Sequence, residues 1–154
     1  MIELSPSEIQ IAVLIGGIRR TESLRQRMKD AHGYDGILAW DMDIEGVAAE
    51  MAYCKARGVY WGAGVNTFKA ADVGKKVQIR STKLKDGCLI VRDNDHDDHY
   101  FVLVVGQLPC FEVVGWILGK DAKRAEFKRA ANGREEAYFV PQNKLNKFTP
   151  AGAK

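Results

Sequence analysis

Four polar side chains in the middle of the chain have the types and the spacing of a site that could hold a cation against phosphate. Glu50 lies in an alanine-rich stretch that predicts a helix, and Asp72 comes just before a short apolar run that predicts a strand. That strand carries Gln78 and Arg80, which should point the same way because strand side chains alternate between faces. The three oxygen-bearing side chains could share one hard divalent cation, and the arginine could neutralise phosphate charge beside it.

This order of residues resembles the PD-(D/E)XK superfamily of nucleases, which share the restriction-endonuclease-like fold. In that family a helical glutamate is followed by an aspartate and then by Glu-x-Lys on the next strand. The resemblance covers Gly46 to about Arg92 and implies that Glu50 and Asp72 bind Mg²⁺ or Mn²⁺ directly. By position, Gln78 would be the third metal ligand in place of a carboxylate, and Arg80 would take the place of the lysine.

Two substitutions separate the chain from the family pattern. Gln78 is neutral, which lowers the charge of the site and weakens the metal affinity that we expect of it. Arg80 stays protonated at any ordinary pH, so it cannot take a proton from water as a lysine might, but it can stabilise charge on the phosphate in the transition state.

Three functions remain open on this basis. The resemblance implies metal-dependent hydrolysis of nucleic-acid phosphodiester bonds, and small relatives in phage and mobile DNA often serve recombination or repair. The alternative is a non-catalytic protein that binds nucleic acid, or assembles with it, on a degenerate nuclease scaffold. The third is a protein-interaction domain in which the acids are ordinary surface charges.

Basic residues are concentrated towards the C-terminal end. The formal net charge is +3, and residues 119–154 hold nine Lys/Arg against four Asp/Glu, an excess of five, so residues 1–118 carry a charge of −2. A basic segment beside an acidic site suits a protein that attracts phosphates while it holds a cation, although a solvated basic face has the same composition. DNA is the expected partner, RNA is not excluded, and the expected phosphate contacts are Lys76, Lys120, Lys123, Arg124, Lys128 and Arg129.

The composition is that of one soluble domain of 154 residues, which is long enough to bury a core of its own. Three widely spaced cysteines without a Cys-x-x-Cys pair predict reduced thiols and a cytoplasmic protein. The N-terminal residues lack the basic start and apolar run of a signal peptide, and the apolar stretch Ile11–Ile18 is too short to span a bilayer. We therefore expect no membrane partner, and a homodimer is left open.

The elements that must position the site are helices first and strands afterwards. Ser5 and Glu8 form the capping-box pattern around an early proline, which predicts a helix from Pro6 to about Arg20 and, after a break, a second helix over residues 22–29. A cationic last turn and a glycine predict that the Glu50 helix ends near Arg57.

After that helix the pattern changes to strands. We expect a strand at 77–82, an apolar meander at 88–91, 100–105 and 111–118, a basic helix at 119–129, a strand at 137–140 and a flexible tail from about 148. This order predicts an α/β or α+β fold with a central mixed sheet and N-terminal helices, as the resemblance also implies.

The segment Asp93–His99 is rich in oxygen and imidazole groups. It does not fit the calcium-loop pattern, because Asp98 stands where the sharp turn needs glycine and Val104 where a bidentate glutamate is required. Since it lies between two predicted strands, we interpret it as the polar tip of a hairpin rather than as a metal site.

Overall fold

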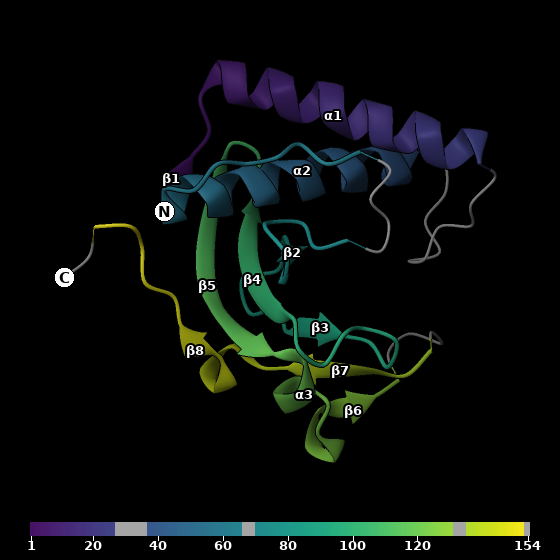
Figure 1. Ribbon diagram of the computed structural model, residues 1–154, viewed down its shortest axis with the longest axis vertical. Helices are drawn as coiled ribbons and strands as arrows, with labels where there is room; N and C mark the ends of the chain where they lie inside the picture. Colours follow the sequence, from purple (N-terminus) through teal and green to yellow (C-terminus); the bar gives the residue numbers. More distant parts are fainter. Residues whose placement is uncertain (27–36, 66–69, 131–134, 153–154) are drawn as a thin grey trace.

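Helices cover one face of a mixed sheet, and a smaller sheet lies on the other side (Figure 1). The computed structural model describes residues 1–26, 37–65, 70–130 and 135–152. The helix α1 (Pro6–Arg25) lies over α2 (Ile37–Arg57), which packs between α1 and the larger sheet. The predicted mixed α+β class is therefore confirmed, whereas the restriction-endonuclease-like form of the fold stays a prediction.

The larger sheet has the strand order β1 (Ile2–Glu3), β5 (Cys110–Leu118), β4 (Tyr100–Gln107) and β2 (Val77–Thr82), with β8 (Asn146–Lys147) also paired to β5. Strands β4 and β5 are antiparallel, whereas β2 runs parallel to β4 with Ile79 opposite Val102. The strand that carries Gln78 and Arg80 therefore lies at the edge of the sheet.

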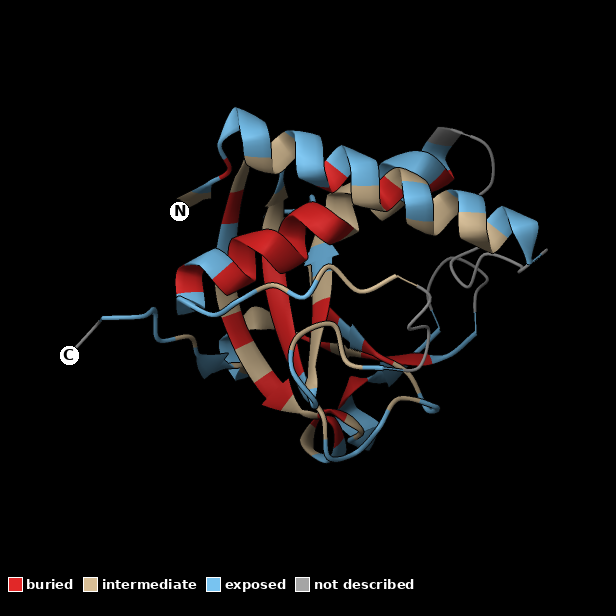
Figure 2. Cartoon of the chain, turned by 45° about the horizontal axis from the view of Figure 1, so that its top comes forward, coloured by how far each residue is buried: buried red, intermediate tan, exposed pale blue. Residues whose placement is uncertain are grey.

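Two apolar cores lie on the two faces of this sheet. Val102 and Val104 of β4 pack with α2, whereas Phe101 and Leu103, which alternate with them, pack towards the smaller sheet. A strand buried on both faces is expected to be apolar at consecutive positions, as β4 is. Figure 2 shows the resulting pattern, in which the second half of α2 and the central strands are buried while the outer side of α1 is exposed.

The smaller sheet is antiparallel, with the order β3 (Leu89–Val91), β7 (Ala137–Val140) and β6 (Lys128–Arg129). The short helical elements of this half are α3 (Gly119–Ala122), η1 (Ala125–Phe127) and η2 (Gln142–Lys144). Strand β3 pairs with β7 and not with β4, so the predicted three-strand meander is wrong at its first strand. Residues 92–99 accordingly connect the two sheets and do not close a hairpin.

The predicted start of α1 is confirmed, but the predicted break after Arg20 is wrong. The Ser5 side chain accepts from the Glu8 amide at 3.3 Å, and the Glu8 carboxylate accepts from the Ser5 amide at 2.6 Å. The helix continues to Arg25, and the Thr21 hydroxyl donates to the Gly17 carbonyl at 3.0 Å without interrupting it. Residues 27–29 of the predicted second helix lie outside the described residues.

The end of α2 is as predicted, since it ends at Arg57 and Gly58 follows with φ of 64°. The predicted flexible tail is wrong for residues 148–151. The Phe148 ring lies 5.9 Å from the Tyr53 ring, and the Ala151 amide donates to the Ala56 carbonyl at 2.9 Å. This segment is therefore docked on the last turns of α2.

The predicted basic helix over 119–129 is also wrong beyond its first turn. Only Gly119–Ala122 is α-helical, because buried Phe127 packs into the second core and the next two residues pair with β7. Strand pairing thus overrides the local helix propensity. In the described ranges no helix is long and apolar enough to cross a membrane, and Cys54, Cys88 and Cys110 are free thiols, as expected.

Candidate functional site

Glu50 is a buried carboxylate held by two side chains. It is 5% exposed and is the one buried charged residue in the described part of the chain. Arg19 of α1 binds both of its oxygens, with Nη1–Oε1 at 2.6 Å and Nη2–Oε2 at 2.9 Å. The Trp61 indole nitrogen donates to Oε2 at 3.0 Å. A buried carboxylate needs such partners, and the bidentate arginine pair is the strongest of them.

Arg19 also ties the two helices to the segment that follows α2. Its Nε donates to the Gly64 carbonyl at 2.9 Å. The helices can approach closely because a Cβ at Gly16 would lie 2.7 Å from the Ile44 Cα. Arg19 was not among the predicted site residues. The signal that could have found it is the Gly16–Gly17 pair, which permits close helix packing one turn before it.

Asp72 lies at the free edge of β2. Its Oδ2 accepts a hydrogen bond from the Ile79 amide at 2.6 Å. Burial, and then the negative charge of Glu50, raises the pKa of Asp72 to about 6, while the Ile79 amide, Arg80 and Arg19 act in the opposite direction. The structure therefore brings Glu50 and Asp72, two of the predicted metal ligands, into electrostatic contact.

Gln78 and Arg80 do not share the face of the sheet that α2 covers. Ile79, between them, packs in the core with α2, so the predicted alternation directs both polar side chains to the opposite face. Gln78 therefore points away from the helix that carries Glu50, and the convergence of Glu50, Asp72 and Gln78 on one cation stays a prediction. Asp72 is held at the strand by the Ile79 amide, and the charges of Glu50, Arg80 and Arg19 all act on its pKa.

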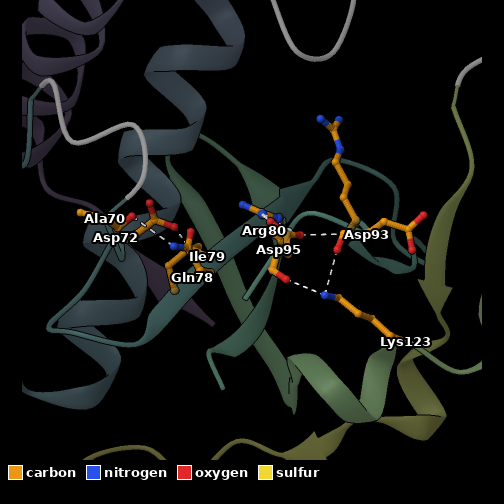
Figure 3. Close-up of polar contacts among 9 residues, drawn as sticks. Ala70, Asp72, Gln78, Ile79, Arg80, Asp93, Asp95 and Lys123 are labelled. Atoms are coloured by element: carbon orange, nitrogen blue, oxygen red, sulfur yellow. Dashed lines mark hydrogen bonds and ion pairs between the residues drawn. The ribbon is translucent and has the colours of Figure 1, made fainter. Parts of the chain in front are cut away.

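Gln78 and Arg80 both have protein partners (Figure 3). The Gln78 Nε2 donates to the Ala70 carbonyl at 3.1 Å, which holds it near the segment that carries Asp72. The Arg80 Nη2 donates to both carboxylate oxygens of Asp95, at 3.0 and 3.2 Å. Arg80 thus has an acidic partner on the connection between the two sheets.

Lys123 has a different role from the predicted phosphate contact. Its ammonium donates to the Asp93 and Asp95 carbonyls at 3.1 and 2.5 Å and to the Asp97 carboxylate at 2.7 Å. Its side chain is only 16% exposed. A lysine surrounded by three oxygens organises the 93–97 backbone and presents little free charge to a partner.

The other predicted phosphate contacts differ in how accessible they are. Lys128 pairs with Asp93 at 3.3 Å, and the Arg129 guanidinium stacks 4.6 Å from the Phe139 ring centroid. Arg124 is 60% exposed, with a long ion pair of 4.0 Å to its neighbour Glu126, and Lys120 is exposed as well. Lys120 and Arg124 are therefore the best placed of the basic set to meet an external anion.

The raised pKa of Asp72 predicts a pH-dependent stability. The ordinary pKa is 3.8 and the folded value about 6, so the ionised carboxylate opposes folding increasingly from pH 4 to 6 and fully above pH 6. At about 1.4 kcal/mol per pKa unit, the cost is of the order of 2–3 kcal/mol. We expect Asp72→Asn to raise the free energy of unfolding by roughly 2 kcal/mol at pH 7 and to leave it nearly unchanged at pH 4.

Urea denaturation at several pH values measures this difference. Asp86→Asn, at an exposed aspartate in the turn after β2, is the matched control and should be neutral throughout. If Asp72→Asn raised the free energy of unfolding equally at pH 4 and pH 7, the effect would not come from the charge of Asp72.

Comparison of the chain with protein-family models, with curated proteins and with solved structures finds no match. What the site can do therefore follows from its side chains. Two crowded carboxylates, one of which titrates near pH 6, can accept a proton or a divalent cation at the edge of β2. The donor set of carboxylate oxygens, with an amide nearby, fits Mg²⁺ or Mn²⁺.

Proposed function

We propose that the protein hydrolyses phosphodiester bonds of DNA with the aid of Mg²⁺ or Mn²⁺ bound at the edge of β2. The observation that carries the proposal is the half-buried Asp72 carboxyl, whose pKa is raised to about 6 by burial and then by the charge of Glu50. A divalent cation would stabilise the ionised form of a carboxyl held in these surroundings. The order of Glu50, Asp72, Gln78 and Arg80 along the chain supports the same function by resemblance.

The side chains divide the work between them. Ile79 holds Oδ2 of Asp72, which leaves Oδ1 as the first ligand atom. Arg19 and Trp61 fix the Glu50 carboxylate, so that it acts from a rigid position. Gln78 points to the face opposite α2 and its amide nitrogen is engaged at Ala70, so it lies beside the proposed ligands rather than among them. A bound cation would polarise the phosphate and activate a water.

Positive charge lies near Asp72 on both sides of the strand. Arg19 and Arg80 each act on the charge of Asp72. Neither arginine can serve as a base, because both remain protonated. Their role in the proposed reaction is to stabilise negative charge that develops on the phosphate.

A second candidate is a protein that binds DNA without cleaving it, and one observation favours it. The bidentate Arg19–Glu50 pair already places a permanent cation against the helical carboxylate. In this alternative the arginine substitutes for the metal. The two functions differ in a single observable, which is cleavage.

Cleavage assays test the choice directly. Purified protein is incubated with labelled duplex, nicked, branched and single-stranded DNA in Mg²⁺, in Mn²⁺ and in EDTA. Cleavage that needs the cation supports the nuclease. If the protein binds DNA in every condition and cleaves it in none, the result supports the protein that binds DNA without cleaving it.

Binding to DNA should be electrostatic and weaken steeply with salt. We expect Lys120→Glu and Arg124→Glu each to reduce the slope of log K against log salt by about one unit per lost phosphate contact. Fluorescence anisotropy between about 50 and 200 mM salt measures the slope. Lys144→Glu makes the same charge change at an exposed residue of η2 and should alter the slope less. Equal slopes in all variants would place the DNA on another surface.

A further inference from the structure

Two histidines and an aspartate gather on the connection between the two sheets. One ligand atom from each of His96, Asp98 and His99 lies within 4.8 Å of the others. The two imidazole rings are 4.6 Å apart at their centroids. Because this set contains nitrogen donors, it differs in kind from the all-oxygen set proposed at the edge of β2.

The backbone that carries these three side chains is fixed by the start of α3. The Gly119 amide donates to the His99 carbonyl and the Lys120 amide to the Asp97 carbonyl, both at 2.9 Å. A Cβ at position 119 would overlap the His96 carbonyl oxygen, so glycine is what permits this close approach. Together with the three bonds from Lys123, these contacts preorganise the segment.

His99 adds an observation that points to a ligand. Its Nδ1 is buried and has no hydrogen-bond partner, and it is the one buried side-chain nitrogen or oxygen in the described ranges for which this holds. Buried polar atoms are normally paired because leaving one unpaired is unfavourable. A neutral imidazole nitrogen with a free lone pair is the commonest metal ligand in proteins.

We propose that His96, Asp98 and His99 bind a divalent transition-metal ion of the Zn²⁺ type, with the remaining coordination positions open to solvent. Imidazole and carboxylate together favour Zn²⁺ and its neighbours over Mg²⁺. In tetrahedral Zn²⁺ coordination with bonds of about 2.0–2.1 Å, the donor atoms lie about 3.3 Å apart. The ligand atoms of His96, Asp98 and His99, which lie within 4.8 Å of one another, must therefore approach each other by about 1.5 Å at most. His96 and Asp98 are exposed and can make this adjustment.

Lys76 competes with the metal for Asp98. Its ammonium lies 2.8 Å from the Asp98 Oδ2, and the two side chains are 54% and 65% exposed. An exposed pair of this kind is weak, so a divalent ion can displace it. Removal of the lysine charge should therefore strengthen metal binding, an effect that non-specific adsorption of metal would not show.

Calorimetric titration of the metal-free protein with ZnCl₂ tests the site. Excess Mg²⁺ is kept present to saturate any all-oxygen site. We expect one Zn²⁺ per chain, weakened at least about tenfold by His96→Ala and by Asp98→Asn, and tightened by Lys76→Gln. His32→Ala, at the remaining histidine of the chain, which lies outside the described residues, is the matched control and should bind as the wild type does.

Three outcomes would overturn the proposal. The first is wild-type protein that binds no Zn²⁺, and the second is His96→Ala and Asp98→Asn variants that bind it as tightly as the wild type. The third is a thiolate-to-metal absorption band on titration with Co²⁺ that disappears in Cys88→Ser, which would assign the metal to a cysteine. His96 and Asp98 are exposed, so both variants should fold, and circular dichroism verifies this.

Discussion

Asp72→Ala is expected to reduce cation-dependent cleavage of DNA about a thousandfold or more, while the protein stays folded. The variant removes the carboxylate that accepts from the Ile79 amide of β2 and that is proposed as the central ligand. Folding should survive, because the lost hydrogen bond to Ile79 is offset by removal of a charge that burial, and then Glu50, makes unfavourable. Initial cleavage rates in saturating Mg²⁺ and Mn²⁺ measure the effect.

Asp72→Asn separates charge from structure in this experiment. The amide keeps an oxygen that can accept from the Ile79 amide, but it carries no negative charge. The cleavage rate of Asp72→Asn should therefore fall almost as much as that of Asp72→Ala, whereas Asp86→Asn should cleave DNA as fast as the wild type. Undiminished cleavage by Asp72→Asn would remove the Asp72 charge from the mechanism.

The second large effect is on stability. Arg19→Met should lower the free energy of unfolding by about 3–5 kcal/mol, because among the described residues it leaves the buried Glu50 carboxylate with Trp61 as its remaining side-chain partner. Chemical denaturation at pH 7 measures the loss. Arg25→Met is the matched control on the same helix, since its partner Glu22 forms an exposed pair, and it should change little.

Two further experiments test whether Arg19 stabilises the protein by neutralising the Glu50 carboxylate, as a bound cation would. The double variant Arg19→Met, Glu50→Leu should recover most of the lost stability, because no buried charge remains unpaired. Mg²⁺ should stabilise Arg19→Met more than it stabilises the wild type, because the metal takes the place of the guanidinium. A loss that neither treatment reverses would mean that Arg19 acts by packing its aliphatic stem.

Local rules are what made part of this structure predictable. The start of α1 follows from Ser5 and Glu8, which are three residues apart, and the alternation of β2 follows from strand geometry alone. Which set of alternating side chains faces α2 is not determined by the local sequence. It depends on which face of β2 meets the helix, and only the packed sheet determines that Ile79, rather than Gln78, points towards α2.

The parts that could not be predicted depend on distant partners. Arg19 lies 31 residues before Glu50, and helix packing alone brings them together. Lys128 and Arg129 form a strand because they pair with Tyr138 and Ala137 of β7, which lies further along the chain. The order of the flanking strands predicts a hairpin tip at Asp93–His99, but these strands belong to different sheets.

The two pairings on the outer side of β5 bear on how the chain folds. Residues 2–3 cover that side at Cys110 and Phe111, and residues 146–147 cover it at Gly115 and Trp116. During synthesis this long strand therefore has an open side until residue 147 has left the ribosome. An uncovered strand edge is a template for pairing with other chains, so loss of β8 should promote aggregation of newly made protein before it affects any chemistry.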